Sequence, residues 1–140
     1  MLLIASTISL KAQKISKYIS LGISVTNGDT LTLASYPSVE FGVSKENISL
    51  GLVLGRGNLR FSDRDAISRY FYEGKVTASE QFGGVKGFVL AGLGNYITTN
   101  HIFIEYGGGL CKSFKNTDYF IQASNFDGQN YISLGATFNF

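Results

Sequence analysis

Side chains that could carry catalysis or hold a metal are few in this chain. Its 140 residues include one His, His101, and one Cys, Cys111. A nucleophile with a base would need His101 beside an acid and a hydroxyl, and the spacing of Thr98 and Thr99 does not favour that arrangement. One His and one Cys also provide neither a zinc-type ligand set nor an intramolecular disulfide. We therefore expect no enzyme, no metal and no cofactor.

Two glycine-rich stretches resemble phosphate-binding loops only superficially. They are Gly92 with Gly94, and residues 107–109. Neither is followed by the Lys-Ser/Thr pair of a phosphate loop, and neither begins a helix. Because glycine within a strand permits close packing, we expect these residues to be structural.

The longer polar residues that could do chemistry lie on the polar side of alternating segments, among Gly and Ser. They are Glu40, Glu73, Lys75, Glu105 and Gln122. Charges inside a narrow interior must pair or change their protonation. We predict that these five residues form a salt-bridged polar network that fills such an interior. A proton or ion path is the alternative.

The overall composition limits the possible functions. Twelve basic and 10 acidic residues give a net charge of +2, which is too balanced for a protein that binds nucleic acid phosphates. Charged residues make up 16% of the chain, below the roughly 25% of an ordinary soluble domain, while aromatic residues reach 14%. We expect one domain, no nucleic acid partner, and a surface that meets something other than water.

Apolar and polar residues alternate along most of the chain, which is the pattern of β-strands with one apolar face. The last segment is the clearest, because Ile132, Leu134 and Phe138 share one face and Ser133 and Thr137 the other. The alternating segments are residues 19–26, 38–44, 48–55, 70–78, 85–96, 102–111, 118–124 and 131–140. They predict an all-β fold: a single closed, antiparallel, up-and-down β-barrel of about eight strands, each roughly 9–11 residues long.

Turn signals separate these segments. They lie at residues 45–47, 79–84, 115–117 and 127–128. Asn27-Gly28 is a further hairpin signal. It would begin one long second strand, whose parity Leu31 and Pro37 keep, and the alternative is a longer loop over residues 27–36. The pattern also leaves open which face of residues 85–96 points inward.

The polar face of these strands indicates their surroundings. No apolar run is long enough for a membrane-spanning helix, so membrane residence would require a barrel. The polar face has few of the Lys and Glu clusters that solubilise an exposed sheet, which favours an interior position and apolar residues facing lipid. A soluble barrel is the alternative. Aromatic residues near strand ends would then form girdles at the membrane interfaces. They are Tyr18, Tyr36, Tyr70, Tyr72, Tyr96, Tyr106, Tyr119, Phe138 and Phe140.

The N-terminus is typical of a processing signal. A short apolar run over residues 2–10 is followed by Lys11 and the small residue Ala12. We predict a signal peptide over residues 1–12, truncated at its start because the usual basic region is missing, and a barrel domain over residues 13–140. A first buried strand or short helix is the alternative.

The chain resembles small eight-stranded bacterial outer-membrane β-barrel proteins. The resemblance rests on residues 131–140, an amphipathic final segment in which Gly135, Phe138 and Phe140 match the family's terminal pattern. The Lys-Ala-Gln ending of the signal resembles signal peptides of Bacteroidetes. The resemblance implies the outer membrane of a Gram-negative bacterium and a C-terminal signal read by the barrel-assembly machinery. Because the interior of an eight-stranded barrel is filled by side chains, we also expect a non-conducting lumen.

Segment 55–70 is the most suggestive surface feature, since it holds Arg56, Arg60, Arg64 and Arg69. The first three keep the parity of the apolar face, so they could project above the hydrocarbon and contact lipopolysaccharide phosphates. A solvated loop in which these arginines pair with Asp63 and Asp65 is equally compatible with the sequence.

Three functions remain from the sequence. The first is a structural or interaction role in the outer membrane, alone or within a larger complex. The second is a module that binds a lipid or small ligand through the Arg-rich loop 56–69 or the lumen. The third is a lipid-modifying enzyme.

Overall fold

The computed structural model describes residues 14–26, 31–61 and 67–140. The predicted signal peptide, Arg64, Asp63 and Asp65 lie outside these residues. In the described part of the chain, no helix has the length and apolar character needed to cross a membrane.

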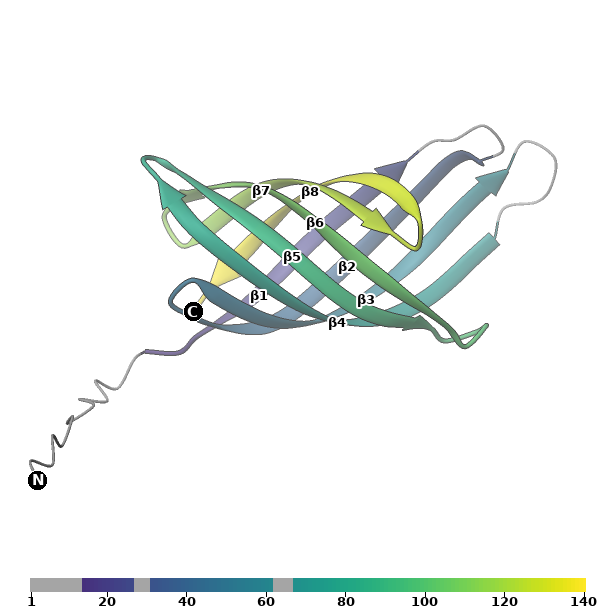
Figure 1. The fold of residues 1–140 in the computed structure, drawn as a ribbon, viewed down its shortest axis with the longest axis horizontal. Coiled ribbons are helices and arrows are strands. Elements are labelled where there is room, and N and C mark those ends of the chain that lie inside the picture. Colours follow the sequence, from purple (N-terminus) through teal and green to yellow (C-terminus); the bar gives the residue numbers. More distant parts are fainter. Residues whose placement is uncertain (1–13, 27–30, 62–66) are drawn as a thin grey trace, which may run out of the picture.

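Eight antiparallel strands close into one barrel in simple sequence order, with β1 paired to β8 (Figure 1). The strands are β1 (Ser16–Thr26), β2 (Leu31–Lys45), β3 (Ile48–Phe61), β4 (Ile67–Phe82), β5 (Val85–Tyr96), β6 (His101–Phe114), β7 (Thr117–Phe126) and β8 (Gln129–Asn139). The predicted closed up-and-down barrel is therefore confirmed.

Five strands, β2 to β6, are longer than the 9–11 residues that the alternation predicted, whereas β1, β7 and β8 fit that length. The lengths run from 10 residues in β7 to 16 in β4. The predicted turn at 79–84 is wrong for residues 79–82, which belong to β4 and pair with residues 85–88 of β5. Polar residues can continue a ladder, since the backbone forms the bonds, and only Gly83 and Gly84 make the turn.

Short turns gather at one end of the barrel, where β1 also begins and β8 ends (Figure 1). We call it the turn end; its turns are residues 46–47, 83–84 and 115–116. The opposite, loop end carries the Asp127-Gly128 hairpin. Both of its central residues have positive φ, 52° and 79°, as a two-residue hairpin with type I′ geometry requires.

The two open points of the sequence pattern are settled by the strand register. β2 begins at Leu31, so residues 31–36 extend the second strand instead of forming a loop. In β5 the side that carries Leu90 and Tyr96 faces inward and is buried, whereas Val89 and Leu93 face outward.

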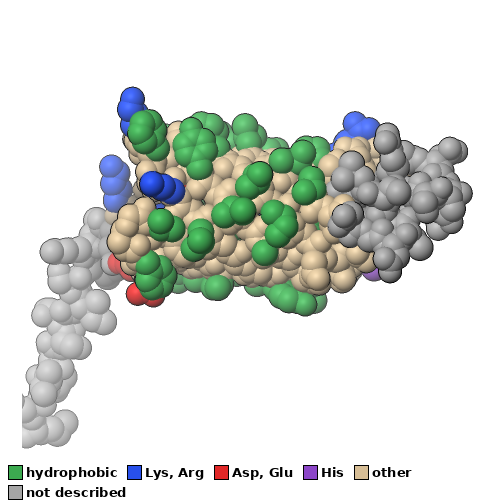
Figure 2. All heavy atoms as spheres, turned by 90° about the horizontal axis from the view of Figure 1, so that it is seen from above, with side chains coloured by type: hydrophobic (Ala, Val, Ile, Leu, Met, Phe, Trp, Pro, Cys, Tyr) green, Lys and Arg blue, Asp and Glu red, His purple; other side chains and the backbone are tan. Residues whose placement is uncertain are grey.

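The outer face is apolar. Large hydrophobic side chains are exposed around the barrel between its ends, for example Leu50 at 57% and Ile104 at 61% (Figure 2). Of the aromatic residues expected in interfacial girdles, Tyr70, Tyr72, Tyr106, Tyr119, Phe138 and Phe140 are exposed on this face. The expectation is wrong for Tyr18, Tyr36 and Tyr96, which are buried. They occupy the inward parity of their strands, and proximity to a strand end alone did not separate the two faces.

Large inward side chains lie against inward-facing glycines of neighbouring strands. A Cβ at Gly55 would lie 2.3 Å from the Phe71 ring, and one at Gly94 would lie 2.3 Å from the Phe103 ring. The narrow barrel can hold these rings because the adjacent strand has no side chain at those points.

Candidate functional site

The first part of the lumen site joins three strands through Glu40. Its Oε1 accepts a hydrogen bond of 2.6 Å from the Tyr18 hydroxyl, and its Oε2 forms a salt bridge with Lys75. Glu40 on β2 and Lys75 on β4 are separated by β3, where the residue between them is Gly51. A Cβ at Gly51 would lie 2.2 Å from Glu40 Oε1, so the glycine is what allows the carboxylate and the ammonium group to meet.

The second part of the site contains the other two predicted acids. Gln122 donates from Nε2 to Glu105 Oε1 at 3.0 Å and to Ser124 Oγ at 3.3 Å. Glu73 is the most deeply buried charged residue, at 1% exposure, and interacts with the Glu105 carboxyl. Within the described residues, Oε1 of Glu73 has no hydrogen-bond partner. The five predicted polar residues thus all face the lumen, in two groups.

Hydroxyl pairs, which the sequence analysis did not single out, line the seam between β1 and β8. Ser24 and Ser133 lie 2.7 Å apart, and Thr137 donates to Ser20 at 2.9 Å. These contacts occur where the first and last strands close the barrel. Ser and Thr alternate on the polar faces of both segments, and this pattern could have indicated the hydroxyl pairs.

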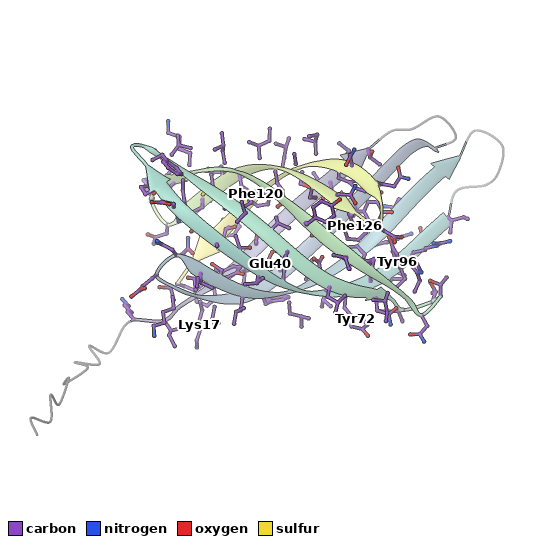
Figure 3. All side chains as sticks on the ribbon, in the orientation of Figure 1. Lys17, Glu40, Tyr72, Tyr96, Phe120 and Phe126 are labelled. Carbon is purple, nitrogen blue, oxygen red and sulfur yellow. The ribbon has the colours of Figure 1, made fainter. Side chains whose placement is uncertain are left out.

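An aromatic cluster fills the lumen toward the loop end, and sequence reasoning missed it. We call it the aromatic plug: Tyr36, Phe71, Tyr96, Phe103, Phe126 and Tyr131. Phe126 lies at its centre, with ring centroids 4.2 Å from Phe103 and 5.3 Å from both Tyr36 and Phe71 (Figure 3). The Tyr36 ring also lies edge-on to the Tyr131 ring, with centroids 5.0 Å apart.

The space left in the lumen is small and divided. A cavity of about 50 Å³ lies among Glu73, Glu105 and the base of the plug. A second cavity of about 150 Å³ lies toward the turn end, where Lys86, Cys111 and Asp118 join the hydroxyl groups of its wall. In the described ranges, no group of three or more His, Cys, Asp or Glu side chains could hold a metal ion.

The predicted arginines do not form one surface. Arg56 is exposed on the outward face, donates from Nη2 to Ser68 Oγ at 2.9 Å, and lies 5.6 Å from the Tyr70 ring centroid. Arg60 pairs with Leu33 in the β2–β3 ladder. Arg69 is on the opposite parity, and its guanidinium lies 5.8 Å from the centroid of the Tyr96 ring in the plug.

His101, the one candidate base, lies at the loop end. Its Nε2 is 2.9 Å from Asp127 Oδ1, and its ring stacks on Tyr96 at 6.1 Å. The pair is exposed, so it joins β6 to the β7–β8 hairpin outside the polar network.

The predicted terminal pattern is divided between the two faces of β8. Gly135 faces inward, where a Cβ would lie 2.4 Å from the Phe120 ring. Phe138 and Phe140 are exposed on the outward face.

The chain matches no protein family and no curated protein. Solved structures resemble it in fold. A designed protein from work on de novo transmembrane β-barrels aligns with a TM-score of 0.62 and 16% identity, over 90% of this chain and 94% of that one. Neisserial surface protein A aligns with a TM-score of 0.59 and 10% identity, over 89% and 94%. The fold is that of a small transmembrane β-barrel. This fold agrees with the apolar outer face and the polar lumen described above.

Proposed function

We propose that this chain is a small outer-membrane β-barrel of a Gram-negative bacterium with a structural or interaction role and a closed lumen. The observation that carries the proposal is the aromatic plug, centred on Phe126, across a lumen whose middle is occupied by paired polar side chains. An ion would have to cross apolar rings without a continuous file of water, which is strongly unfavourable.

The closed lumen can be tested by single-channel recording in planar bilayers. We expect the wild-type barrel to show no conductance steps. The double variant Phe103→Ala/Phe126→Ala, which removes the two most closely packed rings, is expected to give small steps. Steps of similar size in both proteins would contradict the closed lumen.

The proposed location has its own test. When expressed in a Gram-negative host, the chain should fractionate with the outer membrane and require detergent for extraction. Its folded form should migrate differently from the boiled form, because a closed barrel has no free strand edge. Recovery in the soluble fraction without detergent would contradict this location.

Binding of a small ligand is the second candidate, and the cavity at the turn end favours it. This cavity of about 150 Å³ presents both charge signs, from Lys86 and Asp118, and several hydroxyl groups. Native mass spectrometry of protein extracted from its own membrane should detect a small adduct, which a cavity-filling Thr77→Phe variant loses. Absence of any adduct from the wild-type protein would count against this candidate.

The lipopolysaccharide contact remains a proposal centred on Arg56, which lies just beyond Leu54 on the outward face beside Tyr70.

We propose no enzymatic role. His101, the only imidazole in the chain, contacts Asp127 and the Tyr96 ring in the described structure. Assembly through the β8 terminal pattern, and membership of a larger complex, stay proposals of the same kind.

A further inference from the structure

Lysines end the apolar outer face at the turn end of the barrel. Lys17 on β1, Lys45 on β2 and Lys112 on β6 lie on the outward parity of their strands and are exposed. Lys115, in the turn after β6, is also exposed, with its ammonium 5.8 Å from the Phe114 ring centroid. We call these four residues the basic rim.

The basic rim lies at the two sides of one arc of the barrel wall, with Lys112 and Lys115 at β6 and Lys17 and Lys45 on β1 and β2, and the lysine-free strands β7 and β8 between them. Lys17 pairs with Val43, two residues from Lys45, so the two lysines lie on neighbouring strands. Between them and Lys112 the outward positions carry Tyr119 and Phe138, both exposed. Figure 2 shows basic side chains beside hydrophobic ones at this end.

Acidic side chains are missing from the outward strand positions of this arc in the part of the chain that the structure describes. In the described ranges, the outward positions of β6, β7, β8, β1 and β2 include no Asp or Glu. The acidic residues near the turn end are Glu80, outward on β4, Glu46 in the β2–β3 turn, and Asp118, which faces the lumen. Of the salt bridges found among the described residues, none involves a lysine of the basic rim.

The position of these charges indicates the kind of ligand that they would bind. Ammonium groups at the edge of an apolar face extend to the level of lipid headgroups while their methylene stems cover apolar surface. The attraction of one Lys or Arg side chain to an anionic membrane surface corresponds to about a fivefold factor in binding. Neighbouring tyrosine and phenylalanine side chains are typical of the same interface.

We propose that the basic rim is a binding site for the phosphate headgroups of anionic phospholipids in the leaflet at the turn end. This inference rests on the proposed membrane location. It adds a lipid preference that the barrel fold by itself does not supply, and it concerns the opposite end from Arg56.

Spin-labelled lipids in vesicles test the proposal. The barrel is folded into phosphatidylcholine vesicles, and the motionally restricted fraction is compared for labelled phosphatidylglycerol and labelled phosphatidylcholine. We expect wild-type protein to prefer phosphatidylglycerol by about fivefold. The variant Lys17→Gln/Lys45→Gln/Lys112→Gln/Lys115→Gln should lose that preference. Lys86→Gln is the matched control, because Lys86 lines the turn-end cavity and should not contact lipid.

Salt provides a second measurement on unchanged protein. At about 1 M NaCl the Debye length falls to about 3 Å, and the preference should disappear. Equal binding of both lipids by inserted wild-type barrel, or full preference in the fourfold variant, would overturn the lipid site alone. Failure of the wild-type chain to insert, judged by electrophoretic mobility before and after boiling, would overturn the proposed location and this inference together.

Discussion

The carboxyl group of Glu73 on β4 lies directly against the backbone of Gly92 on β5. A Cβ at Gly92 would be 1.6 Å from Glu73 Oε1, far inside any non-bonded contact. Gly92 is also the register partner of Glu105 on β6, so the glycine separates two acidic side chains that interact above it. Glu73 is almost fully buried and cannot swing into solvent.

Gly92→Ala should therefore destabilise the barrel by about 1–3 kcal/mol, because the added methyl group must displace a buried carboxyl group. The measurement is equilibrium unfolding by urea in detergent micelles or thin vesicles. Gly74→Ala is the matched control. Gly74 is on the adjacent strand but faces outward, and a Cβ there would come no closer than 4.0 Å to its nearest neighbour. Equal stability of the two variants would contradict the steric argument.

Lys75→Met should cost about 3–5 kcal/mol, because it leaves Glu40 buried without its cation. The double variant Lys75→Met/Glu40→Gln should recover part of that loss, since neither position then carries a charge. A double-mutant cycle by urea unfolding measures the coupling. Strictly additive losses would mean that the salt bridge contributes nothing to the folded barrel.

Cys111 reports on access to the lumen, because it is the only thiol of the chain and lines the turn-end cavity. A small methanethiosulfonate reagent should modify it in the folded barrel, whereas a polyethylene glycol maleimide should require denaturation. Mass spectrometry after timed labelling measures both rates. Equally fast labelling by the bulky reagent would contradict the narrow cavity.

Phe140→Ala should reduce assembly in cells more than it reduces stability. Loss of one aromatic contact with lipid costs about 1.5–3 kcal/mol, which a folded barrel can tolerate, while the family resemblance implies a further role in recognition. Insertion in a Gram-negative host is compared with refolding in detergent. Phe138→Ala, which changes an outward aromatic residue on the same strand, is the control. Normal insertion of Phe140→Ala would remove the support for an assembly signal.

Much of the fold was predictable because apolar and polar side chains alternate every two residues along the strands. This alternation alone places Ile132 and Leu134 outward and Ser133 inward, and it places Glu40 inward in the same way. The positive-φ turn at Asp127-Gly128 was predictable from residue type alone.

The aromatic plug was not predictable in the same way. Phe126 contacts Phe71 and Tyr36, which are 55 and 90 residues earlier in the chain, and local pattern contains no information on where barrel closure brings them. Parity did place Tyr36 on the inward side, and its assignment to a girdle gave distance from the strand end more weight than parity. For Tyr96 the pattern left the inward face of residues 85–96 open, so parity could not correct the assignment.

The glycine contacts were predictable in kind but not in detail. Gly92 and Gly94 were expected to permit close packing, yet the identity of the opposing group depends on strand stagger. Gly94 lies against an aromatic ring, whereas Gly92 lies against a carboxyl group. The register of the β4–β5 and β5–β6 pairs determines which group opposes each glycine.

Because the strands differ in length, one side of the barrel extends further than the other at the loop end. β2, β3 and β4 contain 15, 14 and 16 residues, against 10 and 11 in β7 and β8. The longer strands reach beyond their neighbours, since Thr26 of β1 pairs with Ala34 and Tyr96 of β5 pairs with Phe71 (Figure 1). Among the described residues, a large molecule that approaches the loop end therefore meets the projecting ends of β2, β3 and β4 before it reaches the lumen. Of the part of the barrel that the structure describes, the ends of β3 and β4 should be the most accessible epitope for an antibody selected against the folded protein.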